Sequence, residues 1–135
     1  CLTGGLLLAP YGFWQEGVML SGLAVLLGHD FPALLGFRGG KGILSGLFIA
    51  LAADWRIALL ILAVFAIVYL LTQYVSMASI LAAATFGIGF AVVYASPFSV
   101  AVGCLLMSAL TIFMHRGNIA RLLKGQERKT NLFKK

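Results

Sequence analysis

The sequence is poor in charged residues, which make up only 10% of its 135 positions, and just four of them are acidic. In contrast, 61% of the residues are hydrophobic, which is more than a soluble domain of this size can bury. This imbalance predicts a protein embedded in lipid. The apolar runs are continuous, and the alternating segments that a membrane β-barrel needs are missing. We therefore expect an all-α, polytopic transmembrane helical bundle.

Cysteine is also scarce, with Cys1 and Cys104 alone in the chain. Neither has neighbours at the spacing of a metal site or a redox pair, so we expect no metal and no cofactor. The sequence opens with Cys1 in place of Met and lacks a basic leading region. This predicts that it begins inside a longer protein, with a lipid-modified mature cysteine as the alternative.

Turn residues divide the chain into about five helices or part-helices. An apolar stretch over 2–9 ends at Pro10, and another over 18–27 ends at a turn that contains Pro32. Spans need roughly 20 apolar residues to cross a hydrocarbon core of about 30 Å. We expect a short helix over 43–53, spanning helices over 57–74, 77–95 and 98–114, and a basic amphipathic extension over 115–125.

Positive charge is concentrated at the C-terminus, where seven of the ten Lys and Arg residues occupy the last twenty positions: Arg116, Arg121, Lys124, Arg128, Lys129, Lys134 and Lys135. A cytoplasmic flank is favoured over a nucleic-acid surface, because base-stacking aromatics are missing there. With this end inside and each span reversing the chain, the polar loop residues converge on one membrane face: His29, Arg38, Lys41, Ser76, Ser79, His115 and Asn118.

Glycines and cations interrupt the apolar sequence from Arg38 to Gly42. Gly39, Gly40 and Gly42 let backbone N–H groups approach an anion, and Lys41 and the following helix N-terminus add positive charge. The spacing differs from that of a nucleotide-binding P-loop. The residues alone favour equally a phosphate site and an interfacial turn whose lysine reaches lipid headgroups.

Two further groups carry polar side chains to the same face. Ser76 fits a helix N-cap better than a ligand role, whereas Ser79, one turn later, could direct its hydroxyl at a substrate. No base lies nearby in the sequence, so a serine nucleophile is unsupported. His115 and Asn118 share a helix face at i and i+3, and structural and functional roles are equally favoured for them.

The blocks from Gly28 to Gly42 and from His115 to Glu127 resemble the second and third motifs of the bacterial acyl-phosphate:glycerol-3-phosphate acyltransferases of the PlsY type. The resemblance covers nearly the whole chain. It implies a bacterial inner-membrane enzyme with an active site that faces the cytoplasm. Such an enzyme transfers a fatty acyl group from acyl phosphate to the 1-hydroxyl of glycerol 3-phosphate, which yields lysophosphatidic acid and phosphate. No acyl carrier protein, coenzyme A or metal is implied, and membrane lipid is the remaining partner.

The resemblance also implies roles for single residues. The expected catalytic residues are His115, Asn118, Lys41 and Ser79. The expected substrate-binding residues are His29, Arg38, Gly39, Gly40, Gly42 and Ser76. Lys41 and the glycines would hold phosphate, His29 would organise the second motif, and His115 with Asn118 would position glycerol 3-phosphate. Which of Ser76 and Ser79 contacts substrate, and whether His115 or a substrate phosphate oxygen accepts the proton, stay open.

The sequence departs from the family pattern in two places. Leu44 and Ser45 follow the Gly-rich loop where the family has a small residue and Thr. The family's first motif, a Ser-Gly-Asn stretch followed by Gly-x-Thr-Asn and Arg, has no counterpart and is expected before Cys1. We therefore expect one integral membrane acyltransferase domain over 1–135, N-terminally incomplete, with a basic cytoplasmic tail over 115–135 and a monomeric state. The alternatives are a non-catalytic remnant and a small-solute transporter, although the spans carry no charge that would mark a transport pathway.

Overall fold

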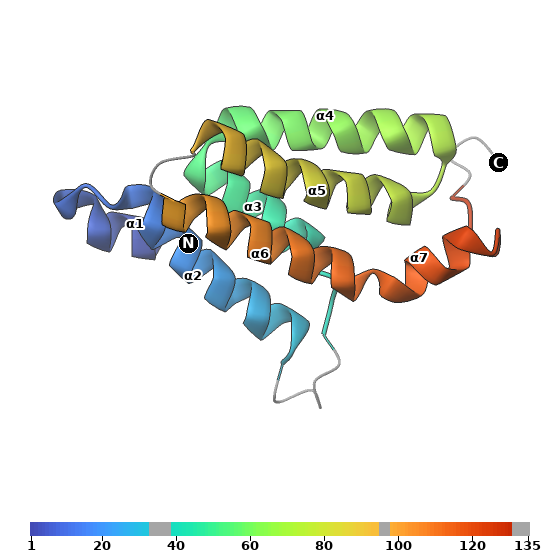
Figure 1. Ribbon diagram of the computed structural model, residues 1–135, viewed down its shortest axis with the longest axis horizontal. Helices are drawn as coiled ribbons and strands as arrows, with labels where there is room; N and C mark the ends of the chain where they lie inside the picture. Colours follow the sequence, from blue (N-terminus) through green and yellow to red (C-terminus); the bar gives the residue numbers. More distant parts are fainter. Residues whose placement is uncertain (33–38, 95–97, 131–135) are drawn as a thin grey trace.

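The computed structural model describes residues 1–32, 39–94 and 98–130, and over these ranges it is entirely helical, with no strand. The elements are α1 (Leu2–Leu8), the 3-10 helix η1 (Ala9–Tyr11), α2 (Trp14–Asp30), α3 (Ile43–Ala53), α4 (Trp55–Thr72), α5 (Val75–Val93), α6 (Phe98–Met114) and α7 (Arg116–Leu123) (Figure 1). The expected helical bundle is confirmed. The seven α-helices of the described residues exceed the expected five.

The largest difference in helix bounds lies in the N-terminal third, where the apolar stretch over 18–27 underestimates the length of a helix. The chain turns through η1, which contains Pro10, and Gly12 follows with a φ of 80° that suits glycine. It then enters α2, which starts at Trp14 and runs through Gln15 and Glu16 before the apolar run begins. Two polar residues in a first turn do not stop a helix, so α2 is 17 residues long and not a short apolar segment.

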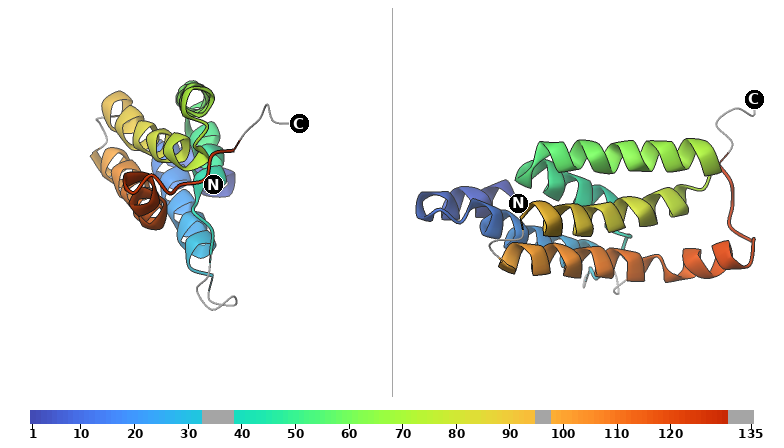
Figure 2. Two further views of the ribbon diagram at one scale, coloured as in Figure 1. Left: turned by 90° about the vertical axis from the view of Figure 1, so that its right-hand side faces the viewer. Right: turned by 45° about the horizontal axis from the view of Figure 1, so that its top comes forward.

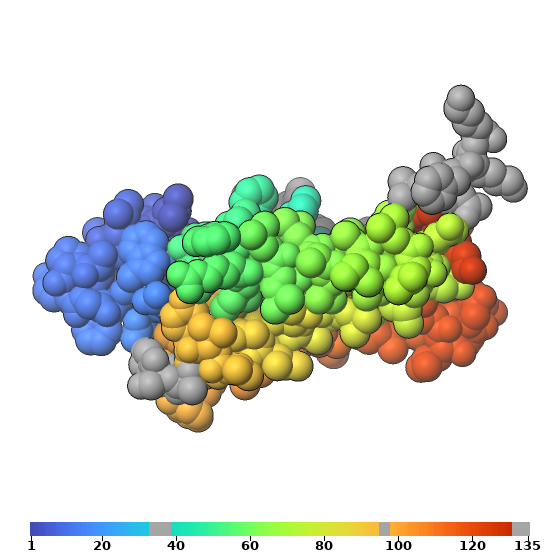
Figure 3. Space-filling model, turned by 90° about the horizontal axis from the view of Figure 1, so that it is seen from above, coloured from blue at the N-terminus to red at the C-terminus, as the bar shows by residue number. Residues whose placement is uncertain are grey.

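Two helices, α4 and α5, are each long and apolar enough to cross a membrane, and α6 together with α7 passes the same criterion as a pair bent by 57°. The outward side of α4 carries large apolar side chains, including Leu59, Leu60, Ile67, Leu70 and Leu71. Figure 3 shows this helix along the surface of the molecule. An apolar surface of this extent suits lipid and not water, so the chain is a membrane protein.

Helix α5 occupies the centre of the bundle, where it packs against α4 on one side and α6 on the other, while α2 contacts α1, α3 and α6 (Figure 2). Small residues allow the close approach of α5 and α6. A Cβ at Gly87 would lie 2.6 Å from the Cβ of Ser108. The Ser108 hydroxyl donates a hydrogen bond of 2.7 Å to the Ala83 carbonyl oxygen, which satisfies a polar group in the bundle interior.

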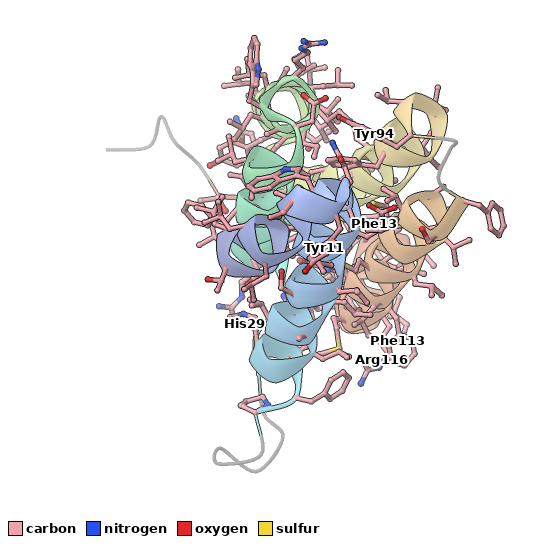
Figure 4. The ribbon with its side chains drawn as sticks, turned by 90° about the vertical axis from the view of Figure 1, so that its left-hand side faces the viewer. Tyr11, Phe13, His29, Tyr94, Phe113 and Arg116 are labelled. Carbon is pink, nitrogen blue, oxygen red and sulfur yellow. The ribbon has the colours of Figure 1, made fainter. Side chains whose placement is uncertain are left out.

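A polar contact closes one end of the bundle. Tyr94, just after α5, donates a hydrogen bond of 2.8 Å from its hydroxyl to Oδ2 of Asp54, whose Oδ1 accepts from the backbone N–H of Arg56 and caps α4. Figure 4 looks at this end of the molecule and shows Tyr94 above Phe13 and Tyr11. The N-termini of α3, α5 and α7 lie at the opposite end.

Candidate active site

The end of the bundle opposite Tyr94 gathers the N-termini of three helices. None of α3, α5 and α7 has an acidic residue in its first turn. In none of them does a side chain of the N-cap residue, which is Gly42, Tyr74 or His115, accept a hydrogen bond from the first N–H groups of the helix. The first N–H groups of a helix therefore remain available, and each terminus carries partial positive charge. Anions are favoured at such termini.

The glycines of the loop before α3 are required by close packing against the end of α2. Gly42 has a φ of 70°, which suits glycine, and a Cβ there would collide with the Leu26 side chain. A Cβ at Gly39 would collide with the backbone of His29 and Asp30, and one at Gly40 with the His29 ring. The Gly40 N–H also donates to the His29 carbonyl oxygen at 3.2 Å. Thus the loop packs against His29, which lies at an exposed position. Arg38 lies outside the described residues.

His115 occupies the bend between α6 and α7 and is 2% exposed. Its Nδ1 lies 2.8 Å from the carbonyl oxygen of Thr111. A carbonyl oxygen only accepts hydrogen bonds, so Nδ1 carries the proton and Nε2 has a free lone pair. Burial is the main reason that the pKa of His115 lies below its usual value. The Lys41 ammonium lowers it further, whereas the bond to Thr111 and the Glu127 carboxylate raise it.

Asn118 is buried one turn into α7 and is held by Glu127. Its Nδ2 donates a hydrogen bond of 2.7 Å to Glu127 Oε1, and Arg121 Nε forms an ion pair of 2.7 Å with Oε2. These donors, Asn118 first, together with the Ser76 hydroxyl lower the pKa of Glu127 to about 2. The amide of Asn118 therefore has a fixed orientation, in which its Oδ1 is left to accept a hydrogen bond from another partner.

Ser76 and Ser79 are both buried in the first turns of α5. The helix begins at Val75 after the N-cap Tyr74, so the N-cap role expected for Ser76 is wrong. Among the described residues, no group meets the geometry of a hydrogen bond with Ser76 Oγ, although this hydroxyl is close enough to Glu127 to affect its pKa. Ser79 follows at i+3 on the same side of the helix. Both hydroxyls stay available as ligands.

The C-terminal segment after α7 is the part of this site that the sequence did not predict. It returns to the turn between α4 and α5, where the Thr130 N–H donates to the Gln73 carbonyl oxygen at 2.9 Å. The Lys129 ammonium also lies 5.4 Å from the centre of the Tyr74 ring. Because of these contacts, the segment that contains Glu127 lies across the N-terminal end of α5. The sequence does contain one signal for this contact, namely the Glu127 carboxylate within an otherwise basic tail, because an acidic residue among cations commonly marks an ion pair.

An apolar cavity of about 140 Å³ lies next to these polar groups. Gly42 and Thr111 line it at the end where Lys41 and His115 lie, and its walls come from α2, α3, α4, α5 and α6. The other lining residues are almost all hydrophobic: Leu26, Ile43, Leu44, Gly46, Leu47, Ile49, Ile61, Leu62, Phe65, Ala82, Ala83, Phe86, Met107 and Ser108. Over the described residues, no group of three His, Cys, Asp or Glu side chains could hold a metal ion. The arrangement thus joins a cluster of helix N-termini to an apolar cavity.

Comparison with known proteins gives consistent matches. The sequence model of the family described as glycerol-3-phosphate acyltransferase matches residues 3–125. A glycerol-3-phosphate acyltransferase of Thermoanaerobacter sp. (strain X514) is 38% identical over 91% of this chain and 62% of its own length. The glycerol-3-phosphate acyltransferase of Clostridioides difficile (strain 630) is 42% identical over 82% of this chain and 53% of its own length. The crystal structure of PlsY, an integral membrane glycerol 3-phosphate acyltransferase in its glycerol 3-phosphate form, superposes with a TM-score of 0.83 at 35% identity, over 95% of this chain and 66% of that one. The chain therefore spans between about half and two thirds of the length of these relatives.

Proposed function

Since the chain belongs to the glycerol-3-phosphate acyltransferase family, we propose that it supplies most of an active site that acylates the 1-hydroxyl of glycerol 3-phosphate. The acyl donor is acyl phosphate, and the products are lysophosphatidic acid and inorganic phosphate. Relatives of this chain include PlsY structures with glycerol 3-phosphate and with lysophosphatidic acid, which supports these two molecules as substrate and product. Neither an acyl carrier protein nor coenzyme A takes part in this reaction.

The observation that carries this proposal is the contact between the anion-binding end and the apolar cavity. Acyl phosphate has an anionic head and an apolar chain, and both parts are matched here within one continuous site. Lys41 and the N–H groups of Gly39 and Gly42 would hold the phosphate of the donor, while the Gly40 N–H stays bonded to the His29 carbonyl oxygen. The acyl chain would enter the cavity below Gly42 and Thr111.

His115 and Asn118 have the chemistry to direct the attacking hydroxyl. In the reaction, the 1-hydroxyl oxygen forms a bond to the acyl carbonyl carbon, and the bond from this carbon to the phosphate oxygen breaks. The free lone pair of His115 Nε2 can accept the hydroxyl proton, while Asn118 Oδ1 can accept a hydrogen bond from a glycerol hydroxyl. Phosphate leaves with the electron pair, so no covalent enzyme intermediate is needed. Ser76 and Ser79 would bind the phosphate of glycerol 3-phosphate.

Charge supports the orientation of the site in the membrane. Arg116, Arg121, Lys124, Arg128 and Lys129 all lie on α7 or beyond it, at the same end as the site. Under the positive-inside rule this end faces the cytoplasm. We therefore place residues 115–135 as a basic cytoplasmic tail of a single domain, in the inner membrane of a bacterium, with a monomer as the working unit.

Variants of Lys41 and His115 test the proposal in the longest polypeptide that contains this chain. We expect Lys41→Ala to lower the rate of lysophosphatidic acid formation by about 10²–10³-fold, as the loss of one charge-stabilising donor does. His115→Ala should lower it by about 10²–10⁴-fold, the range for a general base. Lys124→Ala serves as the control, because Lys124 is an exposed cation on the same segment. Wild-type turnover in both site variants would remove the assignment.

A further inference from the structure

The cavity is too small to enclose a long acyl chain. Its volume is about 140 Å³, close to that of a cavity of about 150 Å³ that accommodates one benzene molecule. A fatty acyl chain of common membrane length is several times larger than benzene. If the chain enters this cavity at the phosphate end, most of it must lie elsewhere.

The interior beyond the cavity is already filled with aromatic side chains. Phe86, which lines the cavity, packs against Phe90 with ring centres 5.1 Å apart, and Phe90 stacks on Tyr94 at 5.7 Å. Phe90 is fully buried, and the Tyr94 hydroxyl is bonded to Asp54 at the far end of the bundle. Because these residues follow one another along α5 away from the site, an acyl chain cannot continue straight down the bundle.

Two residues on one side of the cavity, in contrast, also face outward from the bundle. Leu44 on α3 and Leu62 on α4 both line the cavity, and yet they are 70% and 42% exposed. Exposed apolar side chains on a membrane helix face lipid tails, which are as apolar as leucine itself. A methylene group that passes between these two leucines therefore leaves one apolar environment for another and gains or loses little free energy.

We propose that the cavity holds only the part of the acyl chain next to the carbonyl, and that the rest leaves sideways between α3 and α4, past Leu44 and Leu62, into the lipid. This inference rests on the proposed function. It assigns a substrate specificity to the site: long straight acyl chains are accepted almost regardless of length, since the methylenes outside the cavity make no contact that depends on chain length.

The chain-length profile of the reconstituted full-length protein tests this directly. In a closed pocket, one methylene too many changes kcat/KM by roughly tenfold or more. The side opening instead predicts that kcat/KM differs by less than about threefold among lauroyl, palmitoyl and stearoyl phosphate, since each added methylene rests in lipid. A fall of tenfold or more from palmitoyl to stearoyl phosphate would overturn the inference while leaving the proposed function intact. Absence of turnover with every acyl phosphate would overturn both.

A bulky side chain at the opening provides the second test. We expect Leu62→Trp to impair the reaction of palmitoyl phosphate more than that of octanoyl phosphate, because more of the longer chain must pass this position. The ratio of kcat/KM for palmitoyl phosphate to kcat/KM for octanoyl phosphate should fall by at least about tenfold. Leu59→Trp is the matched control, because Leu59 lies on α4, is 53% exposed and does not line the cavity. The inference is overturned if Leu62→Trp leaves the ratio at the wild-type value, or if Leu59→Trp changes it equally.

Discussion

Glu127 provides the sharpest test of the site, because its carboxylate holds Asn118 in the orientation that the proposed reaction needs. The bond from Asn118 Nδ2 to Glu127 is 2.7 Å long, and the carboxylate, with a pKa of about 2, is charged at every pH suited to an assay. Hydrogen bonds to charged groups contribute about 1.5–3 kcal/mol, against about 0.5–1.5 kcal/mol for neutral ones. Removing the charge and removing the bond should therefore have different effects.

Glu127→Gln keeps an oxygen that can accept from Asn118 but loses the charge. The expected loss of about 1–1.5 kcal/mol corresponds to about a tenfold fall in kcat/KM. Glu127→Ala removes the acceptor altogether, so about 1.5–3 kcal/mol is lost and kcat/KM falls by about ten- to a hundredfold. The assay is lysophosphatidic acid formation from acyl phosphate and labelled glycerol 3-phosphate, with Lys124→Gln as the control on the same exposed segment. Wild-type activity of Glu127→Ala would refute the reasoning, since Asn118 would then need no carboxylate.

Two further predictions concern the pKa of His115 and the backbone conformation of Gly42. The pKa of His115 lies below 6.5 in the folded protein, so its neutral, proton-accepting form should persist as the pH falls below 6.5, and kcat/KM should decline only at lower pH. Lys41→Met should move this decline to higher pH, because the Lys41 charge helps to lower the pKa; a pH–rate profile that is unchanged in the residual activity would contradict this. Gly42→Ala should reduce both folded yield and activity, because it forces a side chain into a φ of 70° and against Leu26. Gly103→Ala, on α6 with open space around its Cβ position, should match wild type in both folded yield and activity.

Helix bounds could be predicted where strong local signals coincide. The sequence predicts 43–53 and 98–114, and the structure places α3 and α6 at those bounds. At α3 a glycine precedes a mostly apolar run, interrupted only by Ser45 and Gly46, that ends before Asp54. Helices α4 and α5 each begin and end two residues earlier than expected. Helix α4 begins early because the Asp54 side chain caps it directly before Trp55. Helix α5 begins early because its first turn includes the polar residue Ser76. Apolar content alone does not detect such caps.

The convergence of the site could also be predicted, whereas its internal contacts could not. Counting spans backward from the basic tail places Lys41 and His115 at one face, and in the structure Gly42, next to Lys41, and Thr111, one turn before His115, line the same cavity. The tie between Glu127 and Asn118 depends on how the chain folds back after α7, through Thr130 and Gln73. That path arises from tertiary contacts of an irregular segment, for which the sequence has no periodic signal.

The scarcity of acidic residues also affects how well this site could bind an anion. An anion at the N-terminus of a helix gains about 0.3–1 kcal/mol at an exposed position, and a carboxylate in the first turn of α3, α5 or α7 would compete with it for the same N–H groups. Glu127 does bring negative charge to this end, but its two oxygens are occupied by Asn118 and Arg121. Its charge is thereby offset by the Arg121 guanidinium, and its remaining effect is to orient an amide. An Arg121→Gln variant would leave the carboxylate without this cation, so the binding of glycerol 3-phosphate should weaken and its KM should rise more than kcat falls. A fall in kcat at unchanged KM would instead show that Arg121 acts on the acyl transfer step itself.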